Sequence, residues 1–455
     1  MRVTVIGGSG YVGFITGLGL AELGHSVVNV DINEQRVEMM NGGNSPIHEE
    51  DVDLSSALEC SLKRKSIRFT TSLEDGVRHG EVIFIAVGTP QKDGGEADLS
   101  QVIGVAKDIT QYIDGYKVLV VKSTVPVGTV ELICSILGAK LREGEDFDIV
   151  SNPEFLREGK GLYDFYNPTR IVVGSGSKRA RAVMRELYQP FLVSGGTDAG
   201  SVDTTFTVRR GTPLVETSIA SAQMIKYASN AFLATRISYI NEISLICERV
   251  GADVLEVARG MGYDDRIGPQ YLQAGIGFGG PCLEKDLSAL IRIAEASGYE
   301  PGVLRSVLDK NEAQVRSIIM KLRELVGYLL YSKEIAVFGL AFKPGTNDVR
   351  TSLSLRIIDL LVQEGARVRA YDPIAVPEAR ELRPSIDFFD DPYQAAAEAH
   401  AILVLTDWPQ FRDLDFQRIK KGMGSACIVD GCNTLRDLAL QDAGFRYVGV
   451  GRAAV

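Results

Sequence analysis

The sequence has few histidines and no paired cysteines. Its four histidines fall in no recognisable motif, and its six cysteines are scattered without a Cys-x-x-Cys pair. This pattern argues against a zinc site or a disulfide framework, so we predict no metal site and a reducing, cytoplasmic compartment. With so little histidine, acid–base chemistry is expected to use lysine, carboxylates or water.

The sequence also lacks an excess of positive charge and a long apolar run. A net charge of −10 argues against non-specific nucleic-acid binding. No uninterrupted apolar run reaches the roughly 18 residues that a membrane span needs. Residues 1–6 lead at once into glycine, so they predict a first strand and not a signal peptide. A chain of 455 residues, 45% hydrophobic and 24% charged, is expected to be a soluble protein of two or three domains.

What is present at the start of the chain is a dinucleotide-binding pattern. A β-branched strand over residues 2–6 leads into Gly8, Gly10 and Gly13, a helical stretch follows, and a second strand ends in Asp31. Glycines at this spacing let a pyrophosphate lie against a helix N-terminus, and the acid can accept hydrogen bonds from a ribose diol. A carboxylate there repels a 2′-phosphate, which favours NAD over NADP. The alternative is an empty Rossmann-like fold with a purely structural turn.

More strand–helix units follow. Strands predicted over 82–87 and 117–121 both end in polar turns, at the edge where ligands gather in open α/β sheets. A third predicted strand, 148–150, leads to Glu154 and Glu158. Carboxylates four residues apart on a turn-to-helix segment could share one face, although an ordinary solvated helix start has the same spacing.

A long helix is predicted next. After a polar segment over 195–211, which we interpret as an exposed loop, residues 218–250 form an amphipathic run without proline or glycine. At about 1.5 Å per residue such a helix is about 50 Å long, enough to leave one domain and carry another. Lys226 and Asn230 are four residues apart and therefore on one face. They indicate either a polar cluster facing a cleft or a snorkelling surface lysine beside a neutral asparagine.

The stretch from Gly275 to Asp286 contains glycines followed by a thiol, an ammonium and a carboxylate. The glycines permit tight turns and a close approach to a ligand. Because the apolar run 287–296 predicts a helix, Cys282 is expected at or just before a helix N-terminus, where the dipole favours a thiolate. A buried, inert cysteine is the alternative, but Lys285 and Asp286 beside the thiol favour chemistry.

Helices are expected up to about Leu330, and one helical segment is expected to include residues 264–268. Strand and helix patterns then resume, with strands predicted over 334–342, 367–373, 401–405 and 426–430. The sequence thus predicts an α/β fold: two Rossmann-like βαβ domains joined by a long central helix and a small all-α dimerisation region. The predicted domains are 1–210, with a 195–211 loop insertion, 211–331 and 332–455. The last has no glycine fingerprint, but Lys343 and Arg350 suit a phosphate-bearing ligand other than a dinucleotide.

Over essentially its whole length the chain resembles the UDP-glucose/GDP-mannose dehydrogenase family. Six ordered stretches carry the resemblance: GSGYVG (8–13), KSTVPVGT (122–129), NPEFLREG (152–159), KYASNAFLATRISYINEI (226–243), DDRIGPQYLQAGIGFGGPCLEKD (264–286) and FKPGTNDVR (342–350). The NAFLAT helix and the GFGG loop are most similar to the UDP-glucose branch, whereas the Cys-Leu pair after that loop is more like the GDP-mannose branch.

The resemblance implies an NAD-dependent, four-electron oxidation of a nucleotide sugar, most like UDP-glucose to UDP-glucuronate, in polysaccharide biosynthesis. For the first hydride transfer it implies Lys226, Asn230 and a water held by Asp286 and Thr124. In the second stage Cys282 would capture the aldehyde as a thiohemiacetal and then carry a thioester. The resemblance also implies that Glu154 is the general base for hydrolysis of the thioester.

The resemblance also implies binding residues. Those for the cofactor are Gly8, Gly10, Tyr11, Val12, Gly13, Asp31, Thr89, Thr124, Glu158 and Lys285. Those for the substrate are Glu154, Phe155, Leu156, Glu158, Lys226, Asn230, Arg266, Tyr271, Gly275, Phe278, Gly279, Lys343 and Arg350. Arg266 matches an arginine that reaches across a dimer interface in this family, which implies a homodimer through the central helix.

Four departures from the family pattern stand out. Gly7-Gly8 replaces a single glycine, so the first turn is one residue longer and contacts to the pyrophosphate are expected to differ. Leu283-Glu284 follows the cysteine in place of Phe-Pro, and Pro281 replaces a small hydroxyl residue. A glutamate facing the thiol would raise the pKa of that thiol, so Glu284 is expected to face outward. Leu353 stands in place of a proline, and the 195–211 segment is an insertion.

Three other readings stay open on the residues. GDP-mannose or a UDP-N-acetylhexosamine could be the substrate of the same chemistry. A two-electron hydroxyacid dehydrogenase shares the Rossmann domain and the Lys/Asn helix but needs no cysteine. A catalytically silent nucleotide-sugar binding protein is supported only by the longer glycine loop and Glu284.

Overall fold

The computed structural model describes residues 1–49, 52–92, 94–193 and 207–452. The described chain divides into two compact units, Met1–Ala228 and Ser229–Val455. Most of the segment interpreted as the 195–211 loop lies outside the described residues. The three domain boundaries predicted above remain a prediction.

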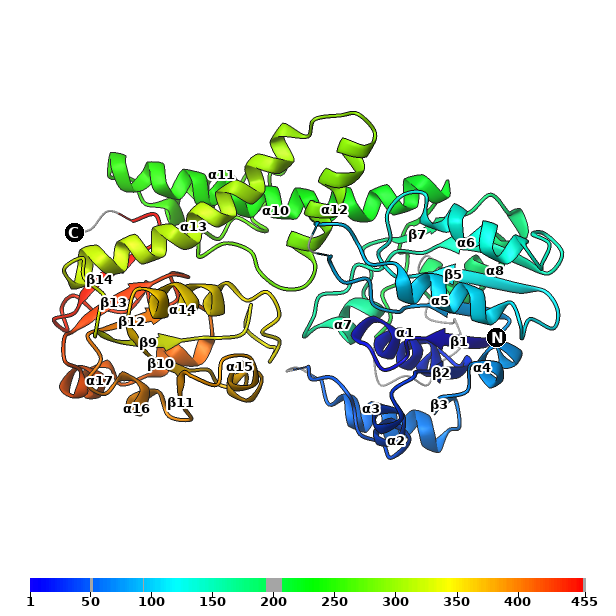
Figure 1. The fold of residues 1–455 in the computed structure, drawn as a ribbon, viewed down its shortest axis with the longest axis horizontal. Helices are drawn as coiled ribbons and strands as arrows, with labels where there is room; N and C mark the ends of the chain where they lie inside the picture. The colour runs from blue at the N-terminus through cyan, green and yellow to red at the C-terminus, as the bar shows by residue number, and fades with distance from the viewer. Residues whose placement is uncertain (50–51, 93, 194–206, 453–455) are drawn as a thin grey trace. The chain divides into compact units, whose positions relative to one another are not determined.

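The first unit is built on a sheet of eight strands within the described residues (Figure 1). Its strand order is β3-β2-β1-β4-β5-β6-β7-β8, and every pairing is parallel except β6 with β7. The strands are β1 (Arg2–Ile6), β2 (Ser26–Val30), β3 (Ile67–Thr70), β4 (Val82–Ile85), β5 (Lys117–Val121), β6 (Phe147–Ser151), β7 (Ile171–Gly174) and β8 (Leu214–Thr217). The predicted parallel sheet is confirmed, including the bounds of β1 and β5.

Helices cover both faces of this sheet because its strands are apolar on both sides. Val118 and Val120 of β5 pack into one core with helix residues such as Phe14, whereas Leu119 and Val121 pack into another. The helices are α1 (Tyr11–Glu22), α2 (Glu34–Asn41), α3 (Leu54–Lys63), α4 (Leu73–His79), α5 (Ser100–Ile109), α6 (Thr129–Gly138), α7 (Gly161–Tyr166), α8 (Lys178–Leu187) and α9 (Gln189–Leu192). The first unit is therefore a doubly wound α/β domain.

A single helix, α10 (Ile219–Val250), begins in the first unit and continues into the second. It matches the predicted 218–250 run, which has no proline or glycine to end it. The second unit continues with α11 (Val254–Gly262), α12 (Leu283–Ala296) and α13 (Gly302–Val326). The helix predicted from residue 287 thus begins earlier, at Leu283, directly after Cys282.

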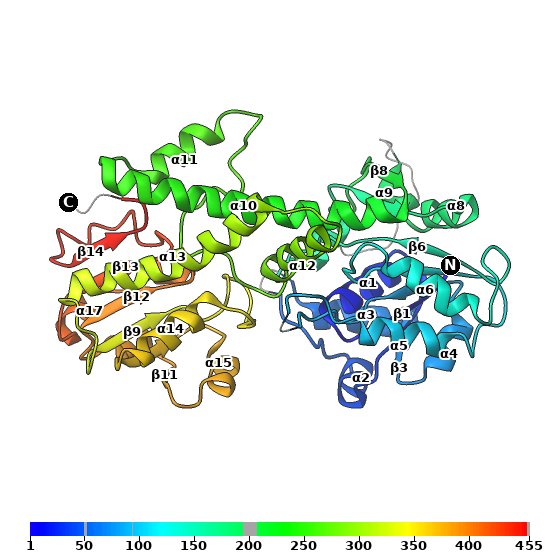
Figure 2. The same ribbon diagram turned by 45° about the horizontal axis from the view of Figure 1, so that its top comes forward.

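The second unit contains a parallel sheet of order β11-β10-β9-β12-β13-β14 in the described chain. Its remaining elements are β9 (Glu334–Phe338), α14 (Leu353–Gln363), β10 (Arg367–Tyr371), α15 (Val376–Leu382), β11 (Asp387–Phe389), α16 (Pro392–Ala396), β12 (Ala401–Val404), η1 (Pro409–Asp413), α17 (Phe416–Gly422), β13 (Cys427–Asp430) and β14 (Arg446–Gly449). Within this unit α13 runs across one face of the sheet, and α16 packs on the other (Figures 1 and 2). Two Rossmann-like sheets are thus present, as predicted.

Three local predictions differ from the structure. The strand predicted over 334–342 ends at Phe338, because Gly339 turns with a φ of +96° and a Cβ there would lie 2.5 Å from Thr406. Residues 152–160 form an irregular loop, so Glu154 and Glu158 share no helical face. The segment 264–268 is a turn beyond the end of α11.

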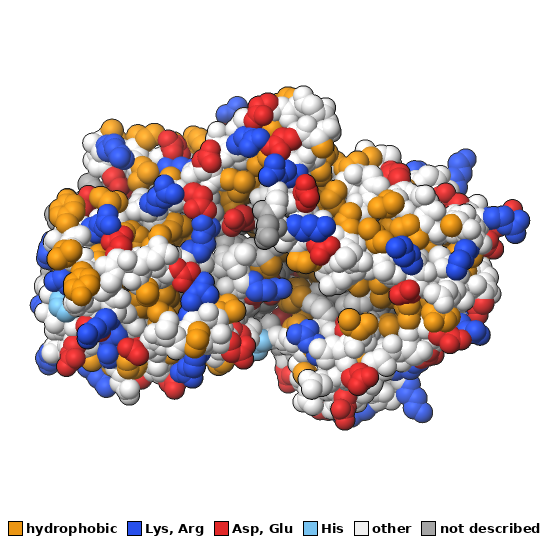
Figure 3. Space-filling view, in the orientation of Figure 1, with side chains coloured by type: hydrophobic (Ala, Val, Ile, Leu, Met, Phe, Trp, Pro, Cys, Tyr) orange, Lys and Arg blue, Asp and Glu red, His pale blue; other side chains and the backbone are white. Residues whose placement is uncertain are grey.

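Within the described residues, no helix combines the length and the apolar character that crossing a bilayer requires. On the face shown in Figure 3, basic and acidic side chains are interspersed.

Candidate active site

The glycine loop after β1 forms a cradle under the start of α1. Gly7 turns with a φ of +86°, and the N–H groups of Gly7 and Gly8 both donate to the Val30 carbonyl at 2.9 and 3.0 Å. A Cβ at Gly13 would lie 2.1 Å from the Gly7 carbonyl oxygen, so only glycine lets the helix approach the turn this closely. No side chain among the described residues caps the first turn of α1. Its N–H groups are thus oriented to bind an anion such as a pyrophosphate.

The glycine loop is also held by Asn29, which the sequence did not single out. The Asn29 amide donates to the Gly8 carbonyl at 3.1 Å, and a Cβ on Gly8 would lie 2.6 Å from that of Asn29. Asp31, at the end of β2, accepts the Ser9 N–H at 2.9 Å and the Asn33 N–H at 3.1 Å. The predicted ribose-binding carboxylate therefore also fixes the glycine loop, and it remains partly exposed.

Tyr11 ties the glycine loop to the start of α7. Its hydroxyl donates to the Glu49 carboxylate at 2.6 Å and accepts the Gly161 N–H at 2.8 Å. Burial, and then the Glu49 carboxylate, raise the pKa of Tyr11 far above its ordinary value. Val12 lies in the first turn of α1, and the Thr89 hydroxyl donates to the Thr124 carbonyl at 2.9 Å, joining the turns that follow β4 and β5.

A buried ion pair lies at the carboxyl end of the first sheet. Nζ of Lys226 on α10 is 2.8 Å from Oε1 of Glu154, and both side chains are buried. The other Glu154 oxygen accepts the Leu156 N–H at 2.5 Å, and the ring of Phe155 lies 5.4 Å from the Lys226 Nζ. Burial alone would raise the pKa of Glu154, but the Lys226 ammonium and these hydrogen bonds outweigh burial and lower it. The surface-lysine interpretation of Lys226 is therefore wrong.

One turn further along α10, Asn230 anchors a second polar group. Its amide donates to Oδ2 of Asp286 at 2.6 Å, and the Lys285 ammonium lies 2.6 Å from Oδ1 of the same carboxylate. Asp286 is almost fully buried, and its N–H donates to the carbonyl of Cys282 at 2.9 Å. The carboxylate thus links α10 to the first turn of α12.

Cys282 is the residue that precedes α12, and its side chain is exposed. This position at a helix N-terminus confirms the expected placement, and the interpretation of a buried, inert cysteine is wrong. Exposure makes the thiol accessible, and its place before the first turn of α12 puts it at the positive end of the helix dipole. Glu284 forms an ion pair with Arg356 of α14 at 3.8 Å.

The glycine stretch before the thiol packs mainly against protein. A Cβ on Gly277 would lie 2.3 Å from Oδ1 of Asn311, one on Gly279 2.8 Å from the Thr351 carbonyl, and one on Gly280 2.6 Å from the Phe342 ring. The Phe278 side chain is buried in an apolar cluster with residues of α10, α12 and α13. The glycines therefore let the loop lie against the start of the second sheet, with Cys282 at its exposed end.

The loop is also clamped by amide side chains that the sequence did not reveal. Asn241 accepts the Gly275 N–H at 2.9 Å, and Gln314 donates to the Gly275 carbonyl at 2.8 Å. Asn311 accepts from the N–H and donates to the carbonyl of Phe278, at 2.8 and 2.9 Å. These residues lie on α10 and α13, and each looks in sequence like an ordinary helical polar residue.

The remaining predicted ligands are more exposed. Arg266 forms an ion pair with Asp264 at 2.6 Å, and Arg350 one with Asp348 at 2.6 Å. Lys343 lies 5.4 Å from the ring of Phe342. Partly exposed positions are taken by Glu158, in the 152–160 loop, and by Tyr271, which has a φ of +61°.

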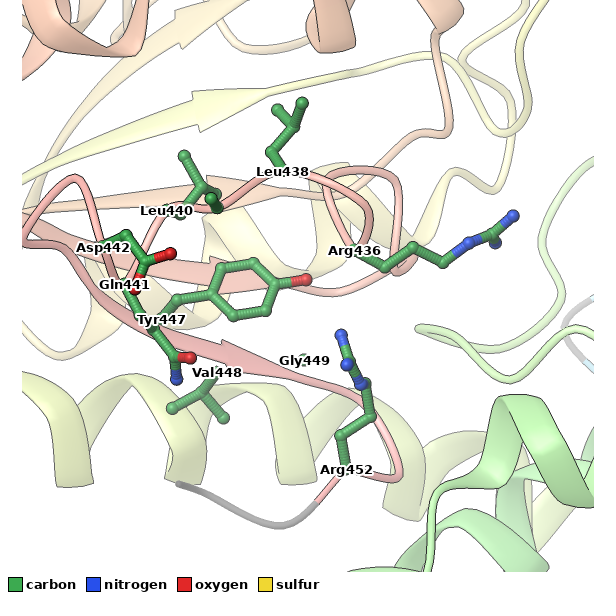
Figure 4. A pocket seen from close by; sticks show the side chains of 10 residues that line it. Arg436, Leu438, Leu440, Gln441, Asp442, Tyr447, Val448, Gly449 and Arg452 are labelled. Carbon is green, nitrogen blue, oxygen red and sulfur yellow. The ribbon is translucent and has the colours of Figure 1, made fainter.

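A small pocket of about 130 Å³ lies beside β14 in the second unit, lined by none of these residues. Figure 4 shows Arg436, Tyr447 and Arg452 on one side of it. Its two arginines are paired with Asp437 at 3.4 Å and Asp253 at 3.1 Å, and the Tyr447 hydroxyl donates to Asp430 at 2.9 Å. Because acids already neutralise both guanidinium groups, the pocket offers no excess positive charge to an anionic ligand.

Comparison with known proteins gives matches over both units. Family models described as the UDP-glucose/GDP-mannose dehydrogenase family match as its NAD binding domain over residues 1–192, its central domain over 220–313 and its UDP binding domain over 336–437. The UDP-glucose 6-dehydrogenase TuaD of Bacillus subtilis is 43% identical over 456 residues, covering 100% of this chain and 94% of the relative.

Solved structures are similar over the same length. A UDP-glucose dehydrogenase from the archaeon Pyrobaculum islandicum has a TM-score of 0.87 at 36% identity, covering 100% of this chain and 98% of that one. A UDP-D-ManNAc dehydrogenase from Pyrococcus horikoshii has a TM-score of 0.85 at 27% identity, covering 100% of both chains.

Proposed function

Since the chain belongs to the UDP-glucose/GDP-mannose dehydrogenase family, we propose that it is an NAD-dependent UDP-glucose 6-dehydrogenase that makes UDP-glucuronate. The observation that carries the proposal is the exposed Cys282 thiol at the start of α12, joined through Asp286 to Asn230. A covalent thiol is what separates a four-electron from a two-electron dehydrogenase.

The first unit fits the cofactor. The glycine cradle has no room for side chains at Gly7, Gly8 or Gly13, and the uncapped start of α1 suits a diphosphate. When bound, NAD⁺ accepts a hydride in each of the two oxidations. We assign its contacts to Gly8, Gly10, Tyr11, Val12, Gly13, Asp31, Thr89, Thr124, Glu158 and Lys285.

In the first oxidation the C6 hydroxyl must lose a proton while its carbon loses a hydride. We assign this proton to Lys226 or to a water held by Asp286 and Thr124, and we assign Asn230 to hold the C6 oxygen. The ion pair at 2.8 Å between Lys226 and Glu154 and the hydrogen bond at 2.6 Å between Asn230 and Asp286 support these roles, because each polar group is fixed before substrate arrives.

The second stage uses the thiol. The Cys282 sulfur adds to the C6 aldehyde to give a thiohemiacetal, which loses a hydride and a proton to become a thioester. Water then attacks the thioester carbonyl, the C–S bond breaks, and the carboxylate leaves with the thiol restored. Glu154, whose pKa lies below its usual value, is ionised near neutral pH and can accept the proton of that water.

The nucleotide sugar is held by the remaining predicted residues. We assign its phosphates to Lys343 and Arg350, because cations are needed to bind a dianion to a protein of net charge −10. The other assigned contacts are Glu154, Phe155, Leu156, Glu158, Lys226, Asn230, Arg266, Tyr271, Gly275, Phe278 and Gly279.

A homodimer through α10 is part of the proposal. Phe232, Tyr239 and Ile246 recur every seven residues on this helix and are 61%, 50% and 48% exposed, and Val250 extends the row. An exposed apolar row at this spacing is typical of a helix–helix interface. Light scattering on the protein and on a Tyr239→Glu, Ile246→Glu variant tests it: a monomeric wild-type protein would contradict the interface.

The same chemistry on a UDP-N-acetylhexosamine is the second candidate, favoured by the similarity to the Pyrococcus horikoshii structure. GDP-mannose is a third substrate to test. We place the enzyme in the cytoplasm, where NAD is available and cysteines stay reduced.

The test is NADH formation across a panel of UDP-glucose, UDP-N-acetylhexosamines and GDP-mannose. We expect two NADH per UDP-glucose consumed and no free aldehyde. One NADH per sugar would overturn the covalent route, and strong preference for another nucleotide sugar would reassign the substrate.

A further inference from the structure

The buried cluster around Glu154 contains a third charge that the assigned chemistry does not use. Lys122 directly follows β5, at the carboxyl end of the sheet, and its side chain is buried. Lys122, Glu154 and Lys226 are 7%, 8% and 5% exposed. Two ammonium groups and one carboxylate are therefore buried at this end of the sheet, and only Lys226 forms an ion pair with the carboxylate among the described residues.

Lys122 makes weaker polar contacts in this cluster than Lys226 does. Its Nζ lies 3.3 Å from Oδ1 of Asn152, and 5.9 Å from the centre of the Phe84 ring. Asn152 is itself fixed, because it donates to the Val172 carbonyl at 2.7 Å and accepts the Tyr188 hydroxyl at 2.7 Å. Asn152 directly follows β6, the strand that pairs with β5, and Glu154 lies two residues further along the chain.

Such a residue is costly to bury. A buried cation without a carboxylate of its own loses hydration that one amide oxygen cannot replace. Burial lowers the pKa of Lys122 to about 8; Glu154 opposes this change and Lys226 adds to it. An apolar side chain of the same length would fill this site at lower cost, so stability alone does not explain a lysine here.

We propose that Lys122 is a positioning residue that keeps Glu154 ionised, so that Glu154 can act as the base of thioester hydrolysis. Its ammonium attracts the carboxylate through the low-dielectric interior and so adds to the effect of Lys226 on the pKa of Glu154. With only Lys226 present, the proton that the pair shares would move to Glu154 more readily. This inference rests on the proposed function.

The test is the pH dependence of turnover in a Lys122→Met variant. Methionine keeps the unbranched stem and removes the charge, so we expect the acid limb of kcat to move up by about one pH unit. Below that limb, the thioester on Cys282 should accumulate and be visible by mass spectrometry of the intact protein. Lys122→Arg, which keeps the charge, should move the limb back toward that of the wild type.

Lys117→Met is the matched control. Lys117 is the first residue of β5 and is also buried, but it pairs with Asp114 at 3.1 Å and lies at the opposite end of the strand from Lys122. Its loss should leave the acid limb in place. A wild-type acid limb in Lys122→Met would overturn the inference.

Thermal unfolding at pH 7 separates this role from a structural one. Since Asn152 keeps Tyr188 as a donor, Lys122→Met should unfold at an equal or higher temperature than the wild type. A variant that fails to fold would overturn the inference, because it would make Lys122 a structural residue. If the wild-type protein oxidises no nucleotide sugar, the proposed function falls, whereas the melting experiment still reports whether Lys122 is an uncompensated buried charge.

Discussion

The two Rossmann-like sheets differ in the surroundings of the aspartate that follows the second strand of each. In the first, Asp31 follows β2, accepts two backbone N–H groups and stays partly exposed. In the second, Asp372 follows β10 and is buried under five donors: the N–H groups of Leu340, Ala341, Ile374 and Ala375 and the indole of Trp408. The first carboxylate can accept a ribose diol, whereas the second is fully used by its own chain.

The turn after the first strand is also more open in the first sheet than in the second. Gly7 to Gly13 form an open cradle below an uncapped helix in the first unit. In the second unit Gly339 turns alone, against Thr406, whose hydroxyl donates to the Ala341 carbonyl at 2.7 Å. One topology thus suits a dinucleotide where glycines leave the first turn open, and it disfavours a dinucleotide where side chains fill that turn.

The largest expected effect is a loss of turnover without a loss of NAD binding. Cys282→Ala should lower turnover at least about 10³-fold, because no other group can carry the thioester. Its affinity for NAD should equal that of the wild type, because the cradle lies in the first unit. NADH formation and fluorescence titration with NADH measure the two quantities. Substantial UDP-glucuronate from the variant would exclude the covalent route.

The next effect tests the open cradle. A Cβ at Gly13 would lie 2.1 Å from the Gly7 oxygen, so Gly13→Ala should weaken NAD binding about 100-fold by displacing the turn. Gly104→Ala on α5, where no atom lies within 4 Å of the added Cβ, is the control and should bind NAD normally. Equal affinities in both variants would contradict a cofactor site in this loop.

Exchanging each acid for its amide sharpens the comparison. Asp31→Asn should weaken NAD binding about tenfold, through loss of a charge-assisted acceptor, with little change in stability. Asp372→Asn should leave NAD affinity intact and lower the free energy of unfolding by about 2–4 kcal/mol, because an amide cannot accept all five hydrogen bonds. Isothermal titration and denaturant unfolding of both variants decide; the reverse pattern would show that the second edge binds the dinucleotide.

The smallest expected effect concerns the buried charge of Lys122 in the first unit. The pKa of Lys122 is lowered to about 8, so below that pH the buried side chain is protonated and its charge destabilises the folded protein. Raising the pH through 8 removes the proton and relieves this cost, so the wild type gains stability relative to Lys122→Met. We expect the variant to melt a few degrees higher at pH 7 and the difference to shrink by pH 9. A difference independent of pH would mean that Lys122 is not the group that titrates.

The spacing of apolar residues predicted much of the fold, because strands and helices each repeat this spacing within a few residues. Apolar strands alternating with helices predicted both sheets, and an uninterrupted amphipathic run predicted α10 almost to the residue. It failed for 152–160, where the spacing of Glu154 and Glu158 suggested a helix. There Glu154 turns inward to Lys226, and the gain from that buried contact and from the Leu156 N–H outweighs local propensity.

The sequence by itself determined the chemistry of the chain, because its glycine fingerprint, its long helix and the Cys282-Lys285-Asp286 cluster act through spacing along the backbone. Only tertiary structure decided which polar groups share a buried interior. Lys122, Asn29 and Asp372 each look ordinary in sequence, and their roles depend on partners 30, 21 and 36 residues away. Charge balance and hydrogen-bond satisfaction are properties of a packed site, and no local pattern records them.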